Sequence, residues 1–327
     1  MTSIEKIKAP VAADLARYES FLRTSLHSEH KLTQAMLDYI FETRGKGIRP
    51  LLVLLSAGMH NHGKKLPQES YLAAMLIEMV HTASLVHDDV IDEADLRRGQ
   101  PSVNAKWNSK RSVIIGDYIL AKSFTTGMQS GAYELVGYIT NGINALCEGE
   151  LIQSEQNDLL EMTREIYFDI ISKKTATLIG ASCGAGAMSV GAGADVVNAM
   201  RQFGDNIGMA FQIKDDILDY SPSEKTGKPL CGDLREGKIT LPLLLLMETA
   251  DARTREEIKE HLRKAWNSPA SLEHLHAMVT NDGGLDRAAE VMNEYVDRAR
   301  NGLRKFPESV FRNSLDDLCL YIAERDK

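Results

Sequence analysis

Two short segments of the chain share the spacing D-D-x-x-D, a pattern suited to binding metal ions. They contain six aspartates: Asp88, Asp89, Asp92, Asp215, Asp216 and Asp219. Residues four apart lie on one face of a helix, so each segment would hold carboxylates that repel one another. No Lys or Arg lies between residues 72 and 95 to offset the first group. Because Mg²⁺ prefers oxygen ligands and binds through a few carboxylates plus substrate phosphates, we expect two or three Mg²⁺ ions holding a diphosphate.

A single segment of this kind is usually a solvated acidic patch. Here both copies are interleaved with apolar residues, Val86 and Ile91 at the first and Ile213 and Ile217 at the second. We therefore favour two partly buried acidic helix faces that act together as a clamp.

Cationic residues gather before, between and after the acidic segments: Lys46, Arg49, Arg97, Arg98, Lys173, Lys174, Lys225, Lys228 and Lys238. Arginine binds phosphate through two parallel hydrogen bonds, whereas lysine acts as a point charge. Alone, each residue would be an ordinary surface cation. Beside two metal-binding faces, the group predicts two sites for phosphates.

The elements that must position these residues are helices. Apolar residues recur at three- and four-residue steps over residues 72–83, 143–153 and 288–299, and strict alternation is rare. Clusters rich in glycine and proline divide the helical stretches. We expect an all-α, single-domain multi-helix bundle over residues 1–327, with the motifs within 45–242 and the helices of 251–327 as scaffold.

The composition narrows the function classes. Among 327 residues, 38 Lys and Arg face 46 Asp and Glu, a net charge of −8 that argues against a nucleic-acid-binding surface. The four cysteines include no C-x-x-C pair, so neither a zinc ribbon nor a disulfide scaffold is predicted. Residues 175–194 are uncharged and long enough to span a bilayer, but five glycines favour a tightly packed buried helix. With no signal-peptide-like segment at residues 1–23, we expect a cytoplasmic protein.

On these motifs the chain resembles the trans-isoprenyl diphosphate synthases. Both D-D-x-x-D segments match that family, as does the G-K-x-x-R-P element at residues 45–50. Further matches at 81–87, 97–104, 174–176 and 227–242 extend the resemblance from 45 to 242 in unbroken order. The chain departs from the family at Arg44, where Gly is common, and at Gly47, where a basic residue is common.

The resemblance implies an all-α bundle around a deep central cavity and an electrophilic chain elongation. An allylic diphosphate, farnesyl or geranylgeranyl diphosphate, would bind through Mg²⁺ between the two Asp motifs and lose its diphosphate. Isopentenyl diphosphate would then attack the allylic cation, and a proton would leave. A dry cavity protects such a cation from water.

The resemblance also implies a role for each site residue. Isopentenyl diphosphate would be held by Lys46, Arg49, His81 and Arg98. The allylic diphosphate would be held by Arg97, Lys174, Lys228 and Lys238, with oxygen dipoles from Thr175 and Gln212. The catalytic set would be Asp88, Asp92, Asp215, Lys174 and Gln212, and all six motif aspartates would be metal ligands.

Product length is predicted from the turn before the first motif. Ala83 and Ser84 lie five and four residues before Asp88, where a bulky aromatic stops chain growth early in the family. Both side chains are small here, which favours an open tunnel and an all-trans product from hexaprenyl to decaprenyl, of the kind used in quinone side chains. The alternative is that they only allow close helix packing.

Other functions remain open. A short-chain farnesyl or geranylgeranyl diphosphate synthase would share the motifs. A non-catalytic partner subunit of a prenyl synthase is disfavoured, because it would not need both Asp motifs intact. A terpene cyclase is disfavoured, because it needs no isopentenyl site and this sequence is predicted to have one. A His-Asp phosphohydrolase built on His87 and Asp88 is disfavoured, because it would need further histidine ligands. We also expect a homodimer, from the small and apolar residues at 116–131 and 175–194, and a product that passes to a membrane.

Overall fold

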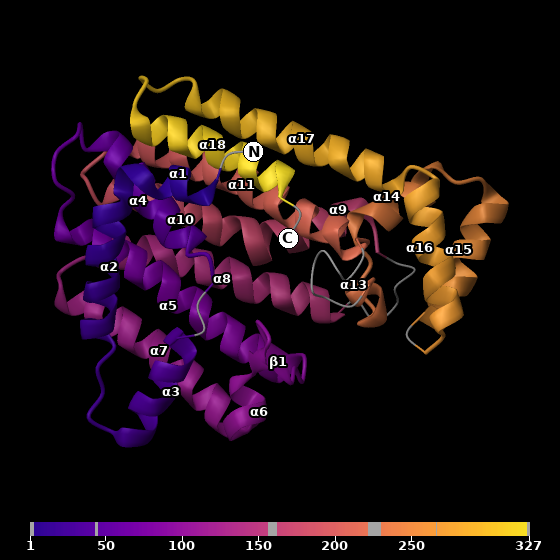
Figure 1. The fold of residues 1–327 in the computed structure, drawn as a ribbon, viewed down its shortest axis with the longest axis horizontal. Coiled ribbons are helices and arrows are strands. Elements are labelled where there is room, and N and C mark those ends of the chain that lie inside the picture. The colour runs from indigo at the N-terminus through magenta and orange to yellow at the C-terminus, as the bar shows by residue number, and fades with distance from the viewer. Residues whose placement is uncertain (1–2, 43–44, 156–161, 222–229, 266, 326–327) are drawn as a thin grey trace.

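The computed structural model describes residues 3–42, 45–155, 162–221, 230–265 and 267–325. These residues form a helical protein with one short two-stranded ribbon (Figure 1). The first elements are α1 (Ile4–Lys8), η1 (Ala9–Val11), α2 (Ala12–Ser25), α3 (Lys31–Glu42), α4 (Ile48–His60), α5 (Gln68–Ile91), β1 (Leu96–Arg97), β2 (Gln100–Pro101), α6 (Val103–Trp107), α7 (Ser109–Gln129) and α8 (Tyr133–Glu155). The remaining elements are α9 (Arg164–Ile171), the π-helical turn η3 (Ser172–Ala176), α10 (Thr177–Met188), α11 (Ala194–Asp219), α13 (Gly232–Arg235), α14 (Leu241–Thr249), α15 (Ala252–Ala265), α16 (Pro269–Asn281), α17 (Gly284–Leu303) and α18 (Val310–Glu324). The all-α prediction is confirmed.

Helix α10 forms the centre of the bundle, and α4, α5, α8 and α11 pack around it. Every residue from Thr177 to Ala187 is buried. A Cβ added at Gly186 would lie 2.3 Å from the carbonyl oxygen of Val53 on α4, so only glycine permits this approach. The expected buried helix is therefore confirmed, and its small residues serve close packing. Within the described residues, no helix has the length and apolar character needed to cross a membrane.

The two Asp motifs lie at the C-terminal ends of the two longest helices. Helix α5 ends at Ile91 with Asp92 as its C-cap, and α11 ends at Asp219. A helix C-terminus carries partial negative charge, which disfavours carboxylates there. Both motifs thus combine mutual repulsion with an unfavourable helix dipole, an arrangement that a bound cation relieves.

A tight hairpin after the first motif positions the arginine pair. Strands β1 and β2 pair antiparallel with Arg97 opposite Gln100. The two turn residues, Arg98 and Gly99, both have positive φ, 54° and 76°. Such a turn suits the twist of a two-residue hairpin, but a positive φ is uncommon for a residue other than glycine. The turn gives the neighbouring arginines different directions.

The last helices enclose one side and one end of the bundle. Helices α17 and α18 run along the bundle, and α15 and α16 form a hairpin at one end (Figure 1). Helix α18 packs on α4 and α11, which brings the C-terminal residues back to the second Asp motif.

Candidate active site

A large pocket separates the two Asp motifs. Its volume is about 520 Å³, and Asp92 of the first motif and Asp216 of the second both line it. Lys174, Gln212 and Lys238 also line this pocket. Apolar side chains complete the wall, among them Leu151, Met162, Ile170, Ile171 and Ile239. The pocket therefore combines charged groups with a hydrophobic surface.

The three carboxylates of the first motif have different surroundings. Asp89 is buried and accepts hydrogen bonds from the Arg97 guanidinium, one of them from Nε at 2.8 Å. Burial, with the negative charges of Glu150 and Asp92, raises the pKa of Asp88 to about 6. Asp92 is 46% exposed and has Lys238 Nζ at 3.8 Å. Asp88 and Asp92 are thus the two carboxylates of this motif without a short hydrogen bond to an arginine.

In the second motif, Asp216 is the centre of a buried network. Its carboxylate accepts hydrogen bonds from the Tyr167 hydroxyl at 2.6 Å and from Gln212 Nε2 at 2.9 Å. The Thr175 hydroxyl donates to Gln212 Oε1 at 2.8 Å. Burial, reinforced by the charge of Asp233, raises the pKa of Asp216 well above its ordinary value. These bonds fix Gln212 and Thr175 at the pocket wall, where sequence reasoning expected their oxygens.

The other two aspartates of this motif also have defined partners. Asp215 accepts a hydrogen bond at 2.6 Å from Arg325, just after α18. Asp219 accepts from the backbone N–H groups of Gly232 and Asp233, at 2.9 and 3.2 Å. Asp219 therefore accepts hydrogen bonds from backbone N–H groups of the short helix α13. The Asp215 side chain is 33% exposed.

A π-helical turn presents Lys174 to the pocket. Single π turns inside helices are frequent at functional sites. Lys174 Nζ lies 2.7 Å from a Glu150 carboxylate oxygen and 2.8 Å from Gln153 Oε1, both on α8. Lys238 pairs with Glu236 at 2.8 Å and lies close to Asp92. Lys228 and Arg44 lie outside the described residues.

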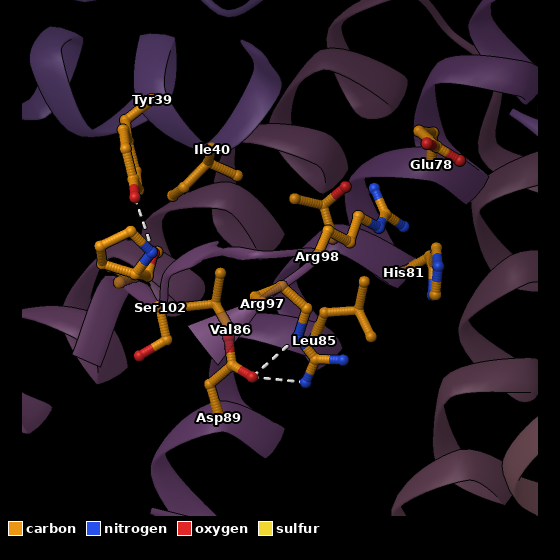
Figure 2. A pocket seen from close by; sticks show the side chains of 13 residues that line it. Tyr39, Ile40, Glu78, His81, Leu85, Val86, Asp89, Arg97, Arg98 and Ser102 are labelled. Carbon is orange, nitrogen blue, oxygen red and sulfur yellow. Dashed lines mark hydrogen bonds and ion pairs between the residues drawn. The ribbon is translucent and has the colours of Figure 1, made fainter. Parts of the chain in front are cut away.

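A second, small pocket of about 60 Å³ is lined by residues of α3, α5 and the β1–β2 hairpin (Figure 2). His81, Arg97 and Arg98 line it together with Glu78 and apolar residues. In Figure 2, the Arg97 guanidinium reaches Asp89, while Arg98 extends toward Glu78 and His81. Arg97 thus connects this cationic pocket with the first Asp motif.

The G-K-x-x-R-P turn lies beside the same arginines. A Cβ at Gly45 would be 2.6 Å from a guanidinium nitrogen of Arg98, so a larger residue would displace that arginine. Gly47, a departure from the family pattern, has φ of 65° and precedes the first residue of α4. Glycine adopts this conformation without the strain that a side chain would add.

Two buried groups make this region electrostatically unusual. Burial, opposed by Glu78 and reinforced by Arg98, lowers the pKa of Arg49 to about 10. Its Nε is shielded from solvent and has no hydrogen-bond partner among the described residues. Burial and the surrounding arginines also lower the pKa of His81 well below its ordinary value. An anion placed here would satisfy the orphaned donor and offset the crowded positive charge.

Lys46 reaches a residue near the C-terminus. Its Nζ lies 3.1 Å from the hydroxyl of Tyr321, and 5.6 Å from the centroid of that ring. Tyr321 is on α18, so this helix contacts the G-K-x-x-R-P turn as well as the second Asp motif.

The residues expected to control product length lie deep in α5. Ala83 is fully buried, and the Ser84 hydroxyl donates to the backbone carbonyl of His81. Neither residue lines the two pockets described above.

Sequence reasoning missed several side chains that the fold brings to the site: Glu78, Tyr167, Tyr321 and Arg325. Glu78 had a local signal, because it is a charged residue in an apolar run and its relative exposure is only 9%. The other three come from distant elements and belong to no motif. Only packing of α9 and α18 against the site reveals them.

The donor set suits hard divalent cations. Carboxylates from both motifs border one pocket, and burial, with the negative charges of Glu150 and Asp92, raises the pKa of Asp88. Such all-oxygen groups favour Mg²⁺ or Ca²⁺ over metals that prefer nitrogen or sulfur.

The comparisons with known proteins agree with this geometry. A family model described as polyprenyl synthetase matches residues 30–279. The all-trans-nonaprenyl-diphosphate synthase (geranyl-diphosphate specific) of Rhodobacter capsulatus is 35% identical over 322 residues, 98% of each chain. Heptaprenyl diphosphate synthase component 2 of Geobacillus stearothermophilus is 35% identical over 315 residues, 96% of each chain.

A solved structure shows the same fold. The polyprenyl synthase of Caulobacter crescentus CB15, crystallised with calcium and isoprenyl diphosphate, superposes with a TM-score of 0.91 at 30% identity. The match covers 99% of this chain and 98% of that one. The chain therefore belongs to the polyprenyl synthetase family and is a prenyltransferase that uses isoprenoid diphosphates.

Proposed function

We propose that this protein is an all-trans polyprenyl diphosphate synthase that adds isopentenyl diphosphate repeatedly to an allylic diphosphate. The observation that carries the proposal is that residues of both Asp motifs line one pocket, with Lys174 and Gln212 between them. The relatives' names, nonaprenyl and heptaprenyl diphosphate synthase, support a long-chain product rather than farnesyl or geranylgeranyl diphosphate.

Asp88, Asp92 and Asp215 would hold two or three Mg²⁺ ions, because none of the three is fully buried, whereas Asp89 and Asp216 are buried and Asp219 accepts from the α13 backbone. Bound Mg²⁺ supplies charge that neutralises the departing diphosphate. The three remaining aspartates, predicted as ligands from the sequence, have structural partners: Arg97 for Asp89, Tyr167 for Asp216 and the α13 backbone for Asp219. We assign these three to positioning the motifs.

The chain's own residues would then orient the allylic substrate. Lys174 and Lys238 contact its diphosphate, and Lys228 is a further candidate. Thr175 and Gln212 hold their oxygens toward the carbon that becomes cationic, because the bond to Asp216 fixes the Gln212 amide. The apolar wall excludes water, which would otherwise trap the cation.

Isopentenyl diphosphate would bind in the second region, through Lys46, Arg49, His81 and Arg98. The orphaned Nε of Arg49 supports this assignment, since a buried donor without a partner costs free energy that a phosphate oxygen would recover. The family resemblance implies that Arg97 holds the allylic diphosphate. Its place between Asp89 and the cationic pocket lets it serve either phosphate group.

The growing chain would pass into the bundle along α5. Ala83 and Ser84 would leave this path open, giving a product from hexaprenyl to decaprenyl length. We treat residues 1–327 as one domain in which the C-terminal helices are scaffold, with α18 also supplying Tyr321 and Arg325 to the site.

We also propose a homodimer. The small residues of α10 are buried within one chain and cannot pair two copies. The neighbouring helix α7 instead exposes large apolar side chains, including Val113, Ile114 and Met128. Sedimentation at micromolar concentration should give twice the chain mass. A fully active monomer would refute the dimer.

The decisive assay uses the purified chain alone with Mg²⁺, isopentenyl diphosphate and either farnesyl or geranylgeranyl diphosphate. Products are sized by chromatography after removal of the diphosphate. Hexaprenyl to decaprenyl products support the proposal. Farnesyl or geranylgeranyl diphosphate as the end product would indicate a short-chain synthase. Absence of any product would favour the role of a non-catalytic subunit.

A further inference from the structure

Three side chains meet on the helical hairpin at one end of the molecule. Glu257 and His261 lie one turn apart on α15, and His274 is on α16 (Figure 1). Their ligand atoms all lie within 4.8 Å of one another. A His274 ring nitrogen lies 2.8 Å from a Glu257 carboxylate oxygen. The rings of His261 and His274 stack with centroids 4.1 Å apart.

One atom in this cluster lacks a partner. His261 Nδ1 is shielded from solvent and has no hydrogen-bond partner among the described residues. A buried polar atom left unpaired costs free energy and calls for an explanation, such as an ion. Burial and the neighbouring His274 lower the pKa of His261, which favours the neutral ring that donates a lone pair to metals.

We propose that Glu257, His261 and His274 form a binding site for a divalent transition metal, with Zn²⁺ as the best candidate. Two imidazoles and one carboxylate are a known zinc ligand set, completed by a water molecule. Two ligand atoms each about 2.1 Å from a common ion are separated by at most about 4.2 Å. Because the His261 and His274 rings stack, binding would require these side chains to rotate so that their nitrogen lone pairs converge on one ion.

The chemistry of the site separates it from the Asp motifs. Imidazole nitrogen favours zinc, copper and nickel, whereas the all-carboxylate motifs favour Mg²⁺. The ion would connect α15 to α16 and stabilise the hairpin through preferential binding to the folded state. Glu257 is exposed, so an ion can enter from solvent.

The test is a Zn²⁺ titration of metal-stripped protein in millimolar Mg²⁺, which occupies the carboxylate sites. Affinity is measured by competition with a chromophoric chelator, and Tm is recorded with and without Zn²⁺. The variants are His261→Ala and His274→Ala, with His27→Ala as control because His27 is exposed and lies elsewhere. Removal of an outer-shell partner lowers metal affinity by roughly tenfold or more. Removal of a ligand should lower the Zn²⁺ affinity by at least as much.

We expect the wild type and His27→Ala to bind one Zn²⁺ and gain thermal stability, and both cluster variants to lose these effects. Mg²⁺-dependent turnover, which this site does not serve, checks that the variants are folded. If either alanine variant misfolds, His261→Gln replaces it. Equal Zn²⁺ affinity in wild type and cluster variants, or no Zn²⁺-dependent stabilisation of the wild type, would overturn the proposal.

Discussion

The Arg325 guanidinium donates a hydrogen bond to the Asp215 carboxylate at 2.6 Å, across 110 residues of sequence. The same nitrogen donates to the Phe211 backbone carbonyl at 3.0 Å, and the guanidinium lies 4.1 Å from the Phe211 ring centroid. The end of the chain therefore fixes the position of one of the three proposed metal ligands.

Arg325→Ala should raise the Mg²⁺ concentration needed for half-maximal turnover by about 10- to 100-fold, since outer-shell partners orient metal ligands. Arg325→Lys should restore part of the loss because it keeps the charge. Arg298→Ala is the control, as Arg298 contacts only Glu294 and the Tyr295 ring of its own helix α17 among the described residues. An unchanged Mg²⁺ requirement in Arg325→Ala would show that the contact has no functional role.

Asp88 should make stability depend on pH in metal-free protein. Its pKa is raised to about 6 in the fold, against about 3.9 in an unfolded chain. Between these values the folded protein binds more protons at this position, so the contribution of Asp88 to stability falls as pH rises. Asp88→Asn should therefore raise Tm at pH 8 in EDTA by about 1–2 °C, after allowance for solvent screening.

The stability gain of Asp88→Asn should be small at about pH 4 and disappear below about pH 3, where Asp88 is protonated in both the folded and the unfolded state. Thermal denaturation at several pH values measures this difference. A gain that is the same at pH 4 and pH 8 would mean that ionisation of Asp88 is not its cause.

The two phosphate sites should separate kinetically. Lys46→Ala and Arg49→Ala should raise KM chiefly for isopentenyl diphosphate, and Lys174→Ala should raise KM chiefly for the allylic substrate, each by about tenfold or more. Initial rates with each substrate varied in turn measure the effects. If Lys46→Ala weakened only the allylic substrate, the assignment of the two sites would be reversed.

Ala83→Tyr should shorten the product to farnesyl or geranylgeranyl diphosphate. The residue is fully buried one turn before Asp88, so a phenol ring must enter the path of the growing chain or displace its neighbours. Ala83→Ser, which stays small, is the matched control. Products are sized under excess isopentenyl diphosphate. The same long product from Ala83→Tyr, with Tm close to wild type, would mean that the chain does not pass residue 83.

Local patterns predicted most of the fold and part of the site. The helical periodicity correctly placed α5, α8 and α17, and the glycine content of α10 correctly indicated a buried helix. Residues expected in one site, such as Lys174, Thr175 and Gln212, line one pocket because η3 packs against α11.

What sequence could not supply were contacts fixed by tertiary packing. The equal spacing of the motif aspartates predicts the same role for all of them. In the structure Asp89 and Asp216 are buried, whereas Asp88 is only partly buried. Arg325 is an ordinary charged residue near the chain end until α18 packs along α11. The exposed apolar residues of α7 likewise follow from which helix faces remain uncovered.

The most direct test of the central claim is the turnover of Asp88→Ala and Asp215→Ala, each measured with saturating substrates and Mg²⁺. Electrostatic stabilisation of a leaving group is worth about 10²- to 10³-fold per group removed. We expect each variant to lose at least this much turnover while circular dichroism and Tm report an intact fold. Near-normal turnover in either folded variant would contradict a clamp formed by both acidic helix ends.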